Sequence, residues 1–478
     1  MVGFYGLFKN WHYAGYLTFL LLAFIFIYGH LDNVLQEPLS EKLEYNPGTI
    51  QLILLAIWAI LLLIIGLRPT WIRLGERHRV TPVLNLIFVI ALTSQGLLGA
   101  KDFVTELPNW VKHVSGNEAL PETGANIALD CAQRPDIYLI IMDGYGRSDV
   151  LKEMYGVDNS PFLKSLERKG FYIADQSKSN FMQTVYSIPS VLNFDYVEAK
   201  PKNISGYQYF PDLIANNNLL KLLKQCDYHM VAFETGFFFT NYPRSDVYLS
   251  EGEVLNEFEG LLLAGTPIDL LIKQLKLKPP ERSYQAHRQR VLYTFSELQK
   301  LPKLYGPKLV LAHIISPHPP FVFDAEGNPV QPNRNYSIGD GDDYRGNRDE
   351  YRQGYADQVK FVDKMLEQTV DAILEQSSVP PIIVIQGDHG PGSHLIWKSP
   401  DQSCLWERTS IFNAYYLPDG GAKNLYPTIS PVNSFRIILN TYFGTQLDLL
   451  PSETYFTSAL GTGFIDITSE RDSKNNCN

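Results

Sequence analysis

The sequence predicts an α/β fold: N-terminal transmembrane helices, followed by a domain built on a mostly parallel sheet covered by helices on both faces. Three observations predict it. Long apolar segments are confined to the first hundred residues. Beyond them, short runs rich in Ile, Leu and Val alternate with segments of helical period. Several of these runs end in Asp or His. Unbroken apolar strands that alternate with helices are typical of parallel sheets buried on both sides.

The N-terminal region contains three apolar segments, at about 13–29, 50–67 and 82–98, and none of them carries a charged residue. Each approaches the roughly 17–20 residues that a helix needs to cross a bilayer. We therefore expect a membrane domain over 1–100 with three transmembrane helices. A buried helix of a soluble domain is the alternative for each segment. A signal peptide is a further alternative for the first, although no small-x-small cleavage site follows it.

The charges of the intervening loops predict the orientation in the membrane. Segment 68–81 carries four arginines against one glutamate, whereas segment 30–49 carries four acidic residues against one lysine. Because positive loops stay on the cytoplasmic side, the N-terminus should lie inside. Three crossings then place everything after about Gly99 outside the cytoplasmic membrane.

Charge and cysteine content limit the classes of function. The net charge of −10, with no basic cluster outside the arginine-rich loop, argues against nucleic acid as a partner. All four cysteines (Cys131, Cys226, Cys404 and Cys477) fall on the predicted outer side, where disulfides form. Four cysteines allow three pairings, and the sequence does not choose among them.

The region after the membrane segments divides into a polar linker over 101–135 and a domain over 136–470. The spacing of apolar residues and of turn residues predicts the elements of this domain. The strands are expected at 136–144, 228–235, 305–316, 380–390 and 408–418, and the helices at 160–170, 213–226, 352–376 and 431–443.

Polar groups gather where three of these strands end. Asp143 ends the first strand, His318 follows the strand at 305–316, and Asp388 and His389 end the strand at 380–390, with His394 shortly after. Ligands of open α/β sheets sit beyond the carboxyl ends of the strands. Buried carboxylates need partners, and a metal ion is a common one.

Asp143, Asp388 and His389 offer two carboxylates and one imidazole, a set that suits one divalent ion such as Zn²⁺ or Mn²⁺ better than Ca²⁺. Three protein ligands leave a fourth position open, and we expect Thr184 there. A cation beside this hydroxyl would favour its alkoxide, which makes Thr184 a candidate nucleophile. His313 lies inside a predicted strand and reads as a core or supporting residue rather than a ligand.

Five stretches carry a resemblance to a known family: "PDIYLIIMDGYGRSD", "SPFLKSLERKGF", "QTVYSIP", "SPHPPF" and "VIQGDHG". Together they resemble the alkaline phosphatase/sulfatase superfamily over roughly 135–418. Within it, the sequence is most similar to membrane-anchored, sulfatase-like phosphotransferases, the phosphoethanolamine transferases and lipoteichoic acid synthases.

The resemblance implies a role for each matching residue. Asp143 takes the place of the first acidic metal ligand, which is often Glu in those transferases. Thr184, five residues before Pro189, aligns with the nucleophile, and Asp388 with His389 matches the metal-binding Asp-His pair. His318 and, as a looser match, His394 correspond to histidines that hold the substrate phosphate or protonate the leaving group.

Departures from the family patterns narrow the expectation. The Cys/Ser-x-Pro-x-Arg string that sulfatases mature to formylglycine does not surround Thr184, which disfavours sulfate ester hydrolysis. We find no convincing copy of the Asp-x-x-x-His segment of two-metal phosphatases, which favours a single metal ion. The transferases usually have five membrane crossings and a disulfide-rich domain, whereas this sequence has three predicted crossings and four cysteines. The identities of the headgroup and of the acceptor therefore stay open.

The sequence thus predicts a metal-dependent transferase, anchored in the cytoplasmic membrane, with its catalytic domain outside. It would move a phosphoethanolamine or phosphoglycerol headgroup from a membrane lipid, through a phosphothreonine intermediate, to a lipid or glycan of the cell envelope. One alternative is a hydrolase of the same fold, a phosphodiesterase or phosphatase that uses water. Another is a catalytically inactive sensor or scaffold. The oligomeric state is not predicted.

Overall fold

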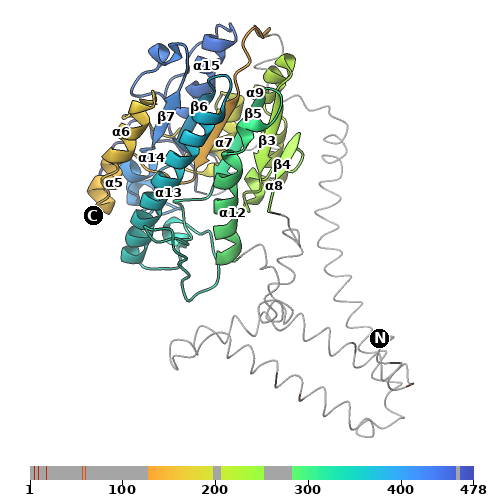
Figure 1. Cartoon of the computed structure of the whole chain (residues 1–478). Helices are drawn as coiled ribbons and strands as arrows, with labels where there is room; N and C mark the ends of the chain where they lie inside the picture. Colours follow the sequence, from red (N-terminus) through yellow and green to blue (C-terminus); the bar gives the residue numbers. More distant parts are fainter. Residues whose placement is uncertain are drawn as a thin grey trace, which may run out of the picture. The chain divides into compact units, whose positions relative to one another are not determined.

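The computed structural model describes residues 127–197, 206–251, 283–458 and 463–477, together with the single positions 5, 9, 18, 56 and 60. The four described ranges lie in one compact unit, which comprises Ala119–Gly252 and Arg282–Asn478 (Figure 1). The predicted membrane segments fall outside the described residues apart from three single positions, so they stay predictions, as do the predicted domain boundaries. Among the residues described, no helix combines the length and the apolar character that a membrane crossing requires.

The core of the domain is a seven-stranded sheet with the order β2-β7-β6-β1-β5-β3-β4. Its strands are β1 (Ile137–Met142), β2 (Tyr172–Ile173), β3 (His229–Phe233), β4 (Val247–Leu249), β5 (Lys308–Ile314), β6 (Ile382–Gly387) and β7 (Asn413–Tyr416). The five strands from β6 to β4 are parallel, and β7 and β2 add an antiparallel edge. The prediction of an α/β domain with a mostly parallel sheet is confirmed. A separate two-stranded antiparallel sheet pairs β8 (Tyr455–Phe456) with β9 (Ile465–Asp466).

Helices cover both faces of this sheet. They are α5 (Ser148–Tyr155), α6 (Ser160–Arg168), α7 (Thr184–Asn193), α8 (Gly206–Ala215), α9 (Asn218–Leu223), α12 (Tyr284–Leu298), α13 (Arg348–Gln376), α14 (Leu405–Thr409) and α15 (Pro431–Tyr442). One core cluster joins α5, α6, α12 and α13 to one face, which α12 and α13 cross in Figure 1. A second cluster joins α7, α9 and α15 to the opposite face.

The alternation of side chains along β1 shows why both faces must be covered. Tyr138, Ile140 and Met142 belong to the first cluster, whereas Ile137 and Leu139 belong to the second. All six residues of the strand are fully buried. A strand buried on both sides has no polar alternation, which is why an unbroken apolar run predicted it correctly.

Side-chain caps explain where several helices begin. Asn347 accepts a hydrogen bond from the amide of Glu350 and starts α13, four residues before the predicted helix. Ser283 caps α12 in the same way through the amide of Ala286. Such caps satisfy amide groups that have no partner within the helix.

Two predicted elements differ from the structure. The single helix expected over 213–226 is interrupted, because Asn217 caps a new helix, α9, by accepting from Leu220. The strand expected over 408–418 is shorter: its first residues complete α14, and β7 begins only at Asn413.

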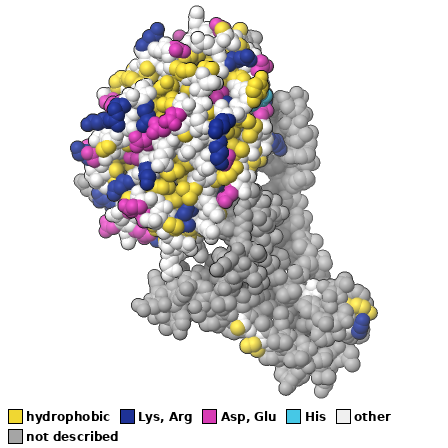
Figure 2. Space-filling view, viewed as in Figure 1, with side chains coloured by type: hydrophobic (Ala, Val, Ile, Leu, Met, Phe, Trp, Pro, Cys, Tyr) yellow, Lys and Arg dark blue, Asp and Glu magenta, His cyan; other side chains and the backbone are white. Residues whose placement is uncertain are grey.

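The four cysteines form two disulfides, Cys131–Cys226 and Cys404–Cys477. The first joins the segments that precede β1 and β3, at the amino edge of the sheet. The second ties the residue before α14 to the end of the described chain. On the face drawn in Figure 2, acidic and basic side chains are interspersed with hydrophobic ones.

Candidate active site

The register of the central strands brings two carboxylates together. Met142 of β1 pairs with Gly387 of β6, so Asp143 and Asp388 leave the sheet side by side. Gly144 follows with a positive φ of 72°, a backbone conformation that glycine adopts without strain. Its amide donates to Oδ1 of Asp388 at 3.1 Å, which locks the two strand ends to each other.

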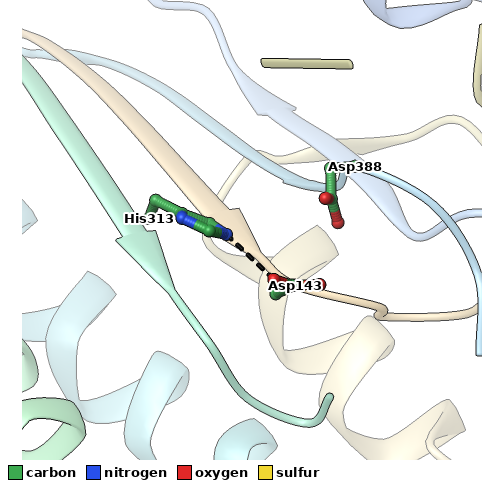
Figure 3. Close-up of side chains that lie close together, drawn as sticks. All are labelled: Asp143, His313 and Asp388. Atoms are coloured by element: carbon green, nitrogen blue, oxygen red, sulfur yellow. Dashed lines mark hydrogen bonds and ion pairs between the residues drawn. The ribbon is translucent and has the colours of Figure 1, made fainter. Parts of the chain in front are cut away.

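His313, the sixth residue of β5, joins this pair. It shares a sheet face with Leu309 and Leu311, and its Nε2 lies 3.1 Å from Oδ2 of Asp143. One ligand atom from each of Asp143, His313 and Asp388 lies within 4.8 Å of the others, and all three residues are buried (Figure 3). The hydroxyl of Thr240 lies 2.9 Å from Nδ1 of His313 and orients the ring.

The charge state of this cluster suits a cation. Burial alone would raise the pKa of Asp143, but the neighbouring His318, His313 and His389 outweigh it and hold the pKa below its usual range. Oδ1 of Asp143 and Oδ2 of Asp388 are buried and accept no hydrogen bond from the described residues. Two buried carboxylate oxygens without donors beside an imidazole fit a divalent metal ion.

Thr184 is the first residue of α7, which packs against the same sheet face as His313. Its Oγ1 lies 3.1 Å from Nε2 of His389, and the residue is 8% exposed. The sequence around Thr184 showed no helical period. The structure explains this, because every residue of α7 is buried and no polar face exists.

At the start of a helix, the amide dipoles favour negative charge near the Thr184 oxygen.

His389 links Thr184 to the two carboxylates. Its Nε2 lies 3.5 Å from both Oδ1 of Asp143 and Oδ2 of Asp388, and Nδ1 lies 2.9 Å from the carbonyl of Gly390. Burial lowers the pKa of His389, and the positive charge of Arg408 lowers it further. A neutral imidazole is the form that binds metals. The structure therefore gathers Asp143, Thr184, Asp388 and His389 in one place.

His318 stands on the loop after β5, and its amide donates to the carbonyl of Asp143 at 3.0 Å. Its ring centroid is 6.0 Å from that of His389, and its Nε2 is 3.7 Å from Oδ2 of Asp340. Burial opposes the charged form, but the carboxylates of Asp143 and Asp340 outweigh it and raise the pKa of His318. The protonated ring can donate to an anionic substrate.

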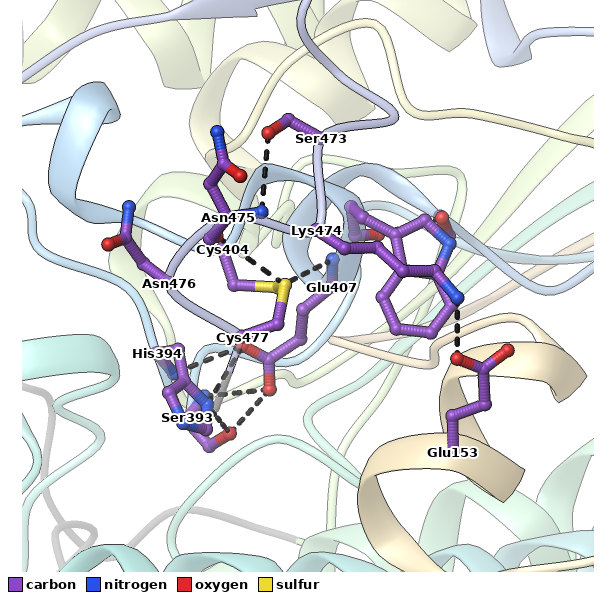
Figure 4. The surroundings of a disulfide bond; sticks show 12 residues. Glu153, Ser393, His394, Cys404, Glu407, Ser473, Lys474, Asn475, Asn476 and Cys477 are labelled. Carbon is purple, nitrogen blue, oxygen red and sulfur yellow. Dashed lines mark hydrogen bonds and ion pairs between the residues drawn. A yellow bond between two sulfur atoms is a disulfide. The ribbon is translucent and has the colours of Figure 1, made fainter.

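The surroundings of His394 differ. Its Nδ1 lies 2.9 Å from the hydroxyl of Ser393 and 3.7 Å from Oε2 of Glu407, and its amide donates to the same carboxylate. Figure 4 shows these groups beside the Cys404–Cys477 disulfide. The described interactions of His394 are thus with Ser393, Cys404 and Glu407 rather than with the Asp143 cluster.

A small cavity of about 10 Å³ adjoins His313, with room for about one water molecule. Glu234 and Arg290 form a buried ion pair in its wall, with 3.2 Å between Oε1 and Nε. The cavity is lined by Glu234, Thr235, His287, Arg290, Val291, Thr294, His313, Ile314 and Ile315.

Comparison with known proteins identifies the family. Residues 135–428 match the model of the family described as sulfatase. The chain belongs to the sulfatase family. The predicted membership of the alkaline phosphatase/sulfatase superfamily is thereby confirmed, over nearly the range expected. No curated protein matches the chain.

Several solved structures are similar to this sulfatase-family chain at low identity. The C-terminal periplasmic domain of EcEptC from Escherichia coli, in complex with Zn, is 13% identical with a TM-score of 0.47, covering 75% of this chain and 100% of that one. Lipooligosaccharide phosphoethanolamine transferase A from Neisseria meningitidis is 14% identical with a TM-score of 0.41, covering 86% and 78%. BT1596, a 2-O GAG sulfatase, is 16% identical with a TM-score of 0.41, covering 66% and 72%.

The positions of two residues in this sulfatase-family site were not predicted from the sequence. His313 was interpreted as a core or supporting residue, because it sits inside an apolar strand, and the structure places it beside Asp143 and Asp388. Its signal was the presence of a histidine one residue before the end of a buried strand. Asp340 approaches His318 from a loop in "IGDGDD", where three aspartates within four positions gave no reason to choose it.

Proposed function

We propose that this protein is a metal-dependent transferase that moves a phospholipid headgroup, phosphoethanolamine or phosphoglycerol, to an acceptor of the cell envelope. Thr184 is the nucleophile. The observation that carries the proposal is the 3.1 Å separation between Thr184 Oγ1 and His389 Nε2, beside two buried carboxylates. A threonine hydroxyl must be activated before it can attack phosphorus. The imidazole of His389 and a metal ion held by the two carboxylates would activate it.

The reaction has two steps that balance. Thr184 loses its proton to solvent, and its oxygen forms a bond to phosphorus while the bond from phosphorus to the glycerol oxygen breaks. His318 donates a proton to that oxygen, so diacylglycerol leaves and a phosphothreonine diester remains. An acceptor hydroxyl then gives its proton to His318 and attacks phosphorus, the bond to Thr184 breaks, and the released Thr184 oxygen regains its proton from solvent. His394 is the second candidate for the proton transfer.

Asp143, Asp388 and an imidazole of His389 or His313 would hold the metal ion. When bound, a Zn²⁺ or Mn²⁺ ion would favour the ionised Thr184 hydroxyl and offset the charge on the phosphoryl oxygens. The surrounding histidines outweigh burial and hold the pKa of Asp143 below its usual range, and an ionised carboxylate is the form that binds a cation.

The first hundred residues support the proposed location of the catalytic domain and a membrane lipid as the headgroup donor. Three apolar segments would anchor the chain in the cytoplasmic membrane, and the loop charges favour an external catalytic domain. An enzyme held in this way has a high local concentration of lipid headgroups. Two disulfides in the catalytic domain accord with an oxidising compartment.

A hydrolase with the same site is the second candidate, and the match to the sulfatase family favours it. Water would then replace the acceptor hydroxyl in the second step. The string required for formylglycine is missing around Thr184, so a phosphate diester or monoester is the substrate expected of such a hydrolase.

Intact-mass analysis of the full chain tests the proposal. The purified protein in detergent is incubated with Zn²⁺ or Mn²⁺ and with vesicles of phosphatidylethanolamine or phosphatidylglycerol. We expect a mass increase equal to one headgroup phosphate, absent in Thr184→Ala, together with released diacylglycerol. Steady release of free headgroup phosphate without transfer to lipid or glycan would identify the hydrolase. Diacylglycerol release by Thr184→Ala at the wild-type rate would overturn both candidates.

A further inference from the structure

Arg408 is the largest of the fully buried side chains that the structure describes, with 1% exposure. It lies near the end of α14, the helix that begins directly after Cys404. The disulfide Cys404–Cys477 therefore fixes the start of the short helix that carries Arg408. Burying a guanidinium group is costly unless every donor finds a partner.

The donors of Arg408 join two segments of the active site. Nε and Nη2 donate to the carbonyl of Met182, at 3.1 and 2.9 Å, two residues before Thr184. Nη1 donates at 3.0 Å to the carbonyl of Gly390, the residue after His389. The guanidinium group thus connects the backbone just before Thr184 to the backbone just after His389.

Asp340 extends these contacts to a third segment. Its Oδ2 accepts from Nη1 of Arg408 and lies 3.7 Å from Nε2 of His318. Its Oδ1 accepts from the hydroxyl of Tyr351 at 2.7 Å, and that hydroxyl accepts from the amide of Gly392 at 2.9 Å. The side chain of Asp340 is therefore fixed on both oxygens.

We propose that Arg408 and Asp340 form a positioning pair that sets the placement of Thr184 relative to His389 and His318. The proposal rests on the proposed function for its kinetic consequences. Three segments that are distant in sequence all contact this ion pair, and each carries one group of the reaction. An error of about 1 Å in such a placement can cost about 100-fold in rate.

The shape of arginine is essential to this role. A lysine would keep the buried positive charge opposite Asp340, but one ammonium group cannot replace a planar fork that bonds two separate carbonyls and a carboxylate. Arg408→Lys therefore loosens the placement while it retains the charge. Asp340→Asn keeps a similar shape and removes the charge beside His318.

Arg436 provides a matched control. It is also buried, and it donates to the carbonyls of Phe194 and Asp448 at 2.8 and 2.7 Å. Phe194 closes the far end of α7, the helix that begins with Thr184. Arg436→Lys thus removes the same kind of contact from the same helix at the end away from the site.

The test measures fluorescent diacylglycerol released by the full chain from phosphatidylethanolamine or phosphatidylglycerol vesicles with labelled acyl chains. We expect Arg408→Lys and Asp340→Asn to lower kcat by about 10- to 100-fold, with KM and bound metal nearly unchanged. Arg436→Lys should lower the melting temperature as much as Arg408→Lys and leave kcat at the wild-type value. Wild-type kcat in both Arg408→Lys and Asp340→Asn would overturn the positioning role.

Crystal structures of wild type and Arg408→Lys supply a readout that needs no substrate. The distance from Thr184 Oγ1 to His389 Nε2 should lengthen by about 1 Å in the variant. An unchanged distance would overturn the inference even if the wild type were active. A wild type that releases no diacylglycerol, with the distance lengthened in the variant, would instead refute the proposed function and leave the positioning role standing.

Discussion

The hydroxyl of Thr184 lies 3.1 Å from Nε2 of His389, although 205 positions separate the two residues. The contact joins the start of a buried helix to a residue two positions after a fully buried strand. Neither element has freedom to move away without opening the core. Packing therefore keeps the Thr184 hydroxyl beside the carboxylate–imidazole cluster, and the contacts of Arg408 with Met182 and Gly390 add to this placement.

Two substitutions of Thr184 distinguish the role of its hydroxyl from the role of its side-chain shape. Thr184→Val keeps the branched side chain in its buried position and removes the oxygen. We expect diacylglycerol release to fall by at least about 1,000-fold, because loss of a covalent nucleophile removes most of the rate enhancement. Thr184→Ser should retain measurable release. Equal activity of the Val and Ser variants would show that the hydroxyl does not react.

Metal binding should depend on Asp388. Chelation of the wild type is expected to lower its melting temperature. Metal that is present at about 100 times its dissociation constant stabilises a protein by about 2.7 kcal/mol. Asp388→Asn should bind no stoichiometric Zn²⁺ or Mn²⁺ by elemental analysis and should not respond to chelator.

Two imidazoles compete for the third ligand position. His389 was predicted from the sequence, whereas His313 offers a ligand atom within 4.8 Å of those of Asp143 and Asp388. A ligand replaced by Gln should lose stoichiometric metal, whereas a supporting histidine replaced by Gln should weaken binding by about 10- to 100-fold. Titration of His389→Gln and His313→Gln with Zn²⁺ decides between them.

Measurements of kcat should distinguish the two candidate proton donors, His318 and His394. His318→Gln is expected to lower kcat by about 10²- to 10⁴-fold, the usual range for a lost general acid. His394→Gln should mainly lower the melting temperature, because His394 contacts Ser393 and the buried Glu407. A large loss of kcat in His394→Gln with His318→Gln unaffected would reverse the assignment.

Asp363 should make stability depend on pH. Burial, with a smaller contribution from Glu367, raises its pKa to about 8, although the hydrogen bond from Tyr145 opposes the shift. The folded protein therefore keeps a proton that the unfolded chain releases near pH 4. Its contribution to stability is complete below pH 4 and is lost as pH rises towards 8, by about 1.4 kcal/mol per pH unit.

Denaturant unfolding of wild type and Asp363→Asn at pH 5, 6, 7 and 8 measures this effect. The unfolding free energy of the wild type should fall with pH relative to that of the variant. The half-exposed Asp371, about two turns along α13, supplies the control variant Asp371→Asn, which should follow the wild type. Parallel curves for wild type and Asp363→Asn would rule out a buried, protonated Asp363.

The two disulfides should differ in their effect on activity. The Cys404–Cys477 bridge spans 73 residues, and its removal is expected to cost about 4 kcal/mol. Replacing both cysteines by Ala should also lower kcat, because α14 carries Arg408. Removal of Cys131–Cys226, at the amino edge of the sheet, should lower the melting temperature while kcat stays unchanged.

Several elements of the site could be predicted because burial alone determines them. The apolar runs of β1 and β6 ended in Asp143 and in Asp388 with His389, and polar groups at such positions have few structural uses. The α7 helix could not be found in this way. All of its residues are buried, so no polar face marked the helical period.

Other features depend on contacts between distant segments. The sequence left three cysteine pairings open, and only the folded chain selects two bridges. Asp340 meets Arg408 across 68 positions, and neither stands out among the charged residues near it. The sequence does not predict a buried ion pair of this kind, because the two partners come together only in the folded chain.

The amino-acid sequence by itself determined the α/β class, the strand ends that carry the polar groups and Thr184 as the nucleophile to test. Only the tertiary structure decided which imidazoles lie beside Asp143 and Asp388, and how Arg408 joins the segments around them. The reason is physical. Apolar patterning records whether each residue is buried, whereas distances between side chains depend on strand register and helix packing, which arise from the whole chain at once.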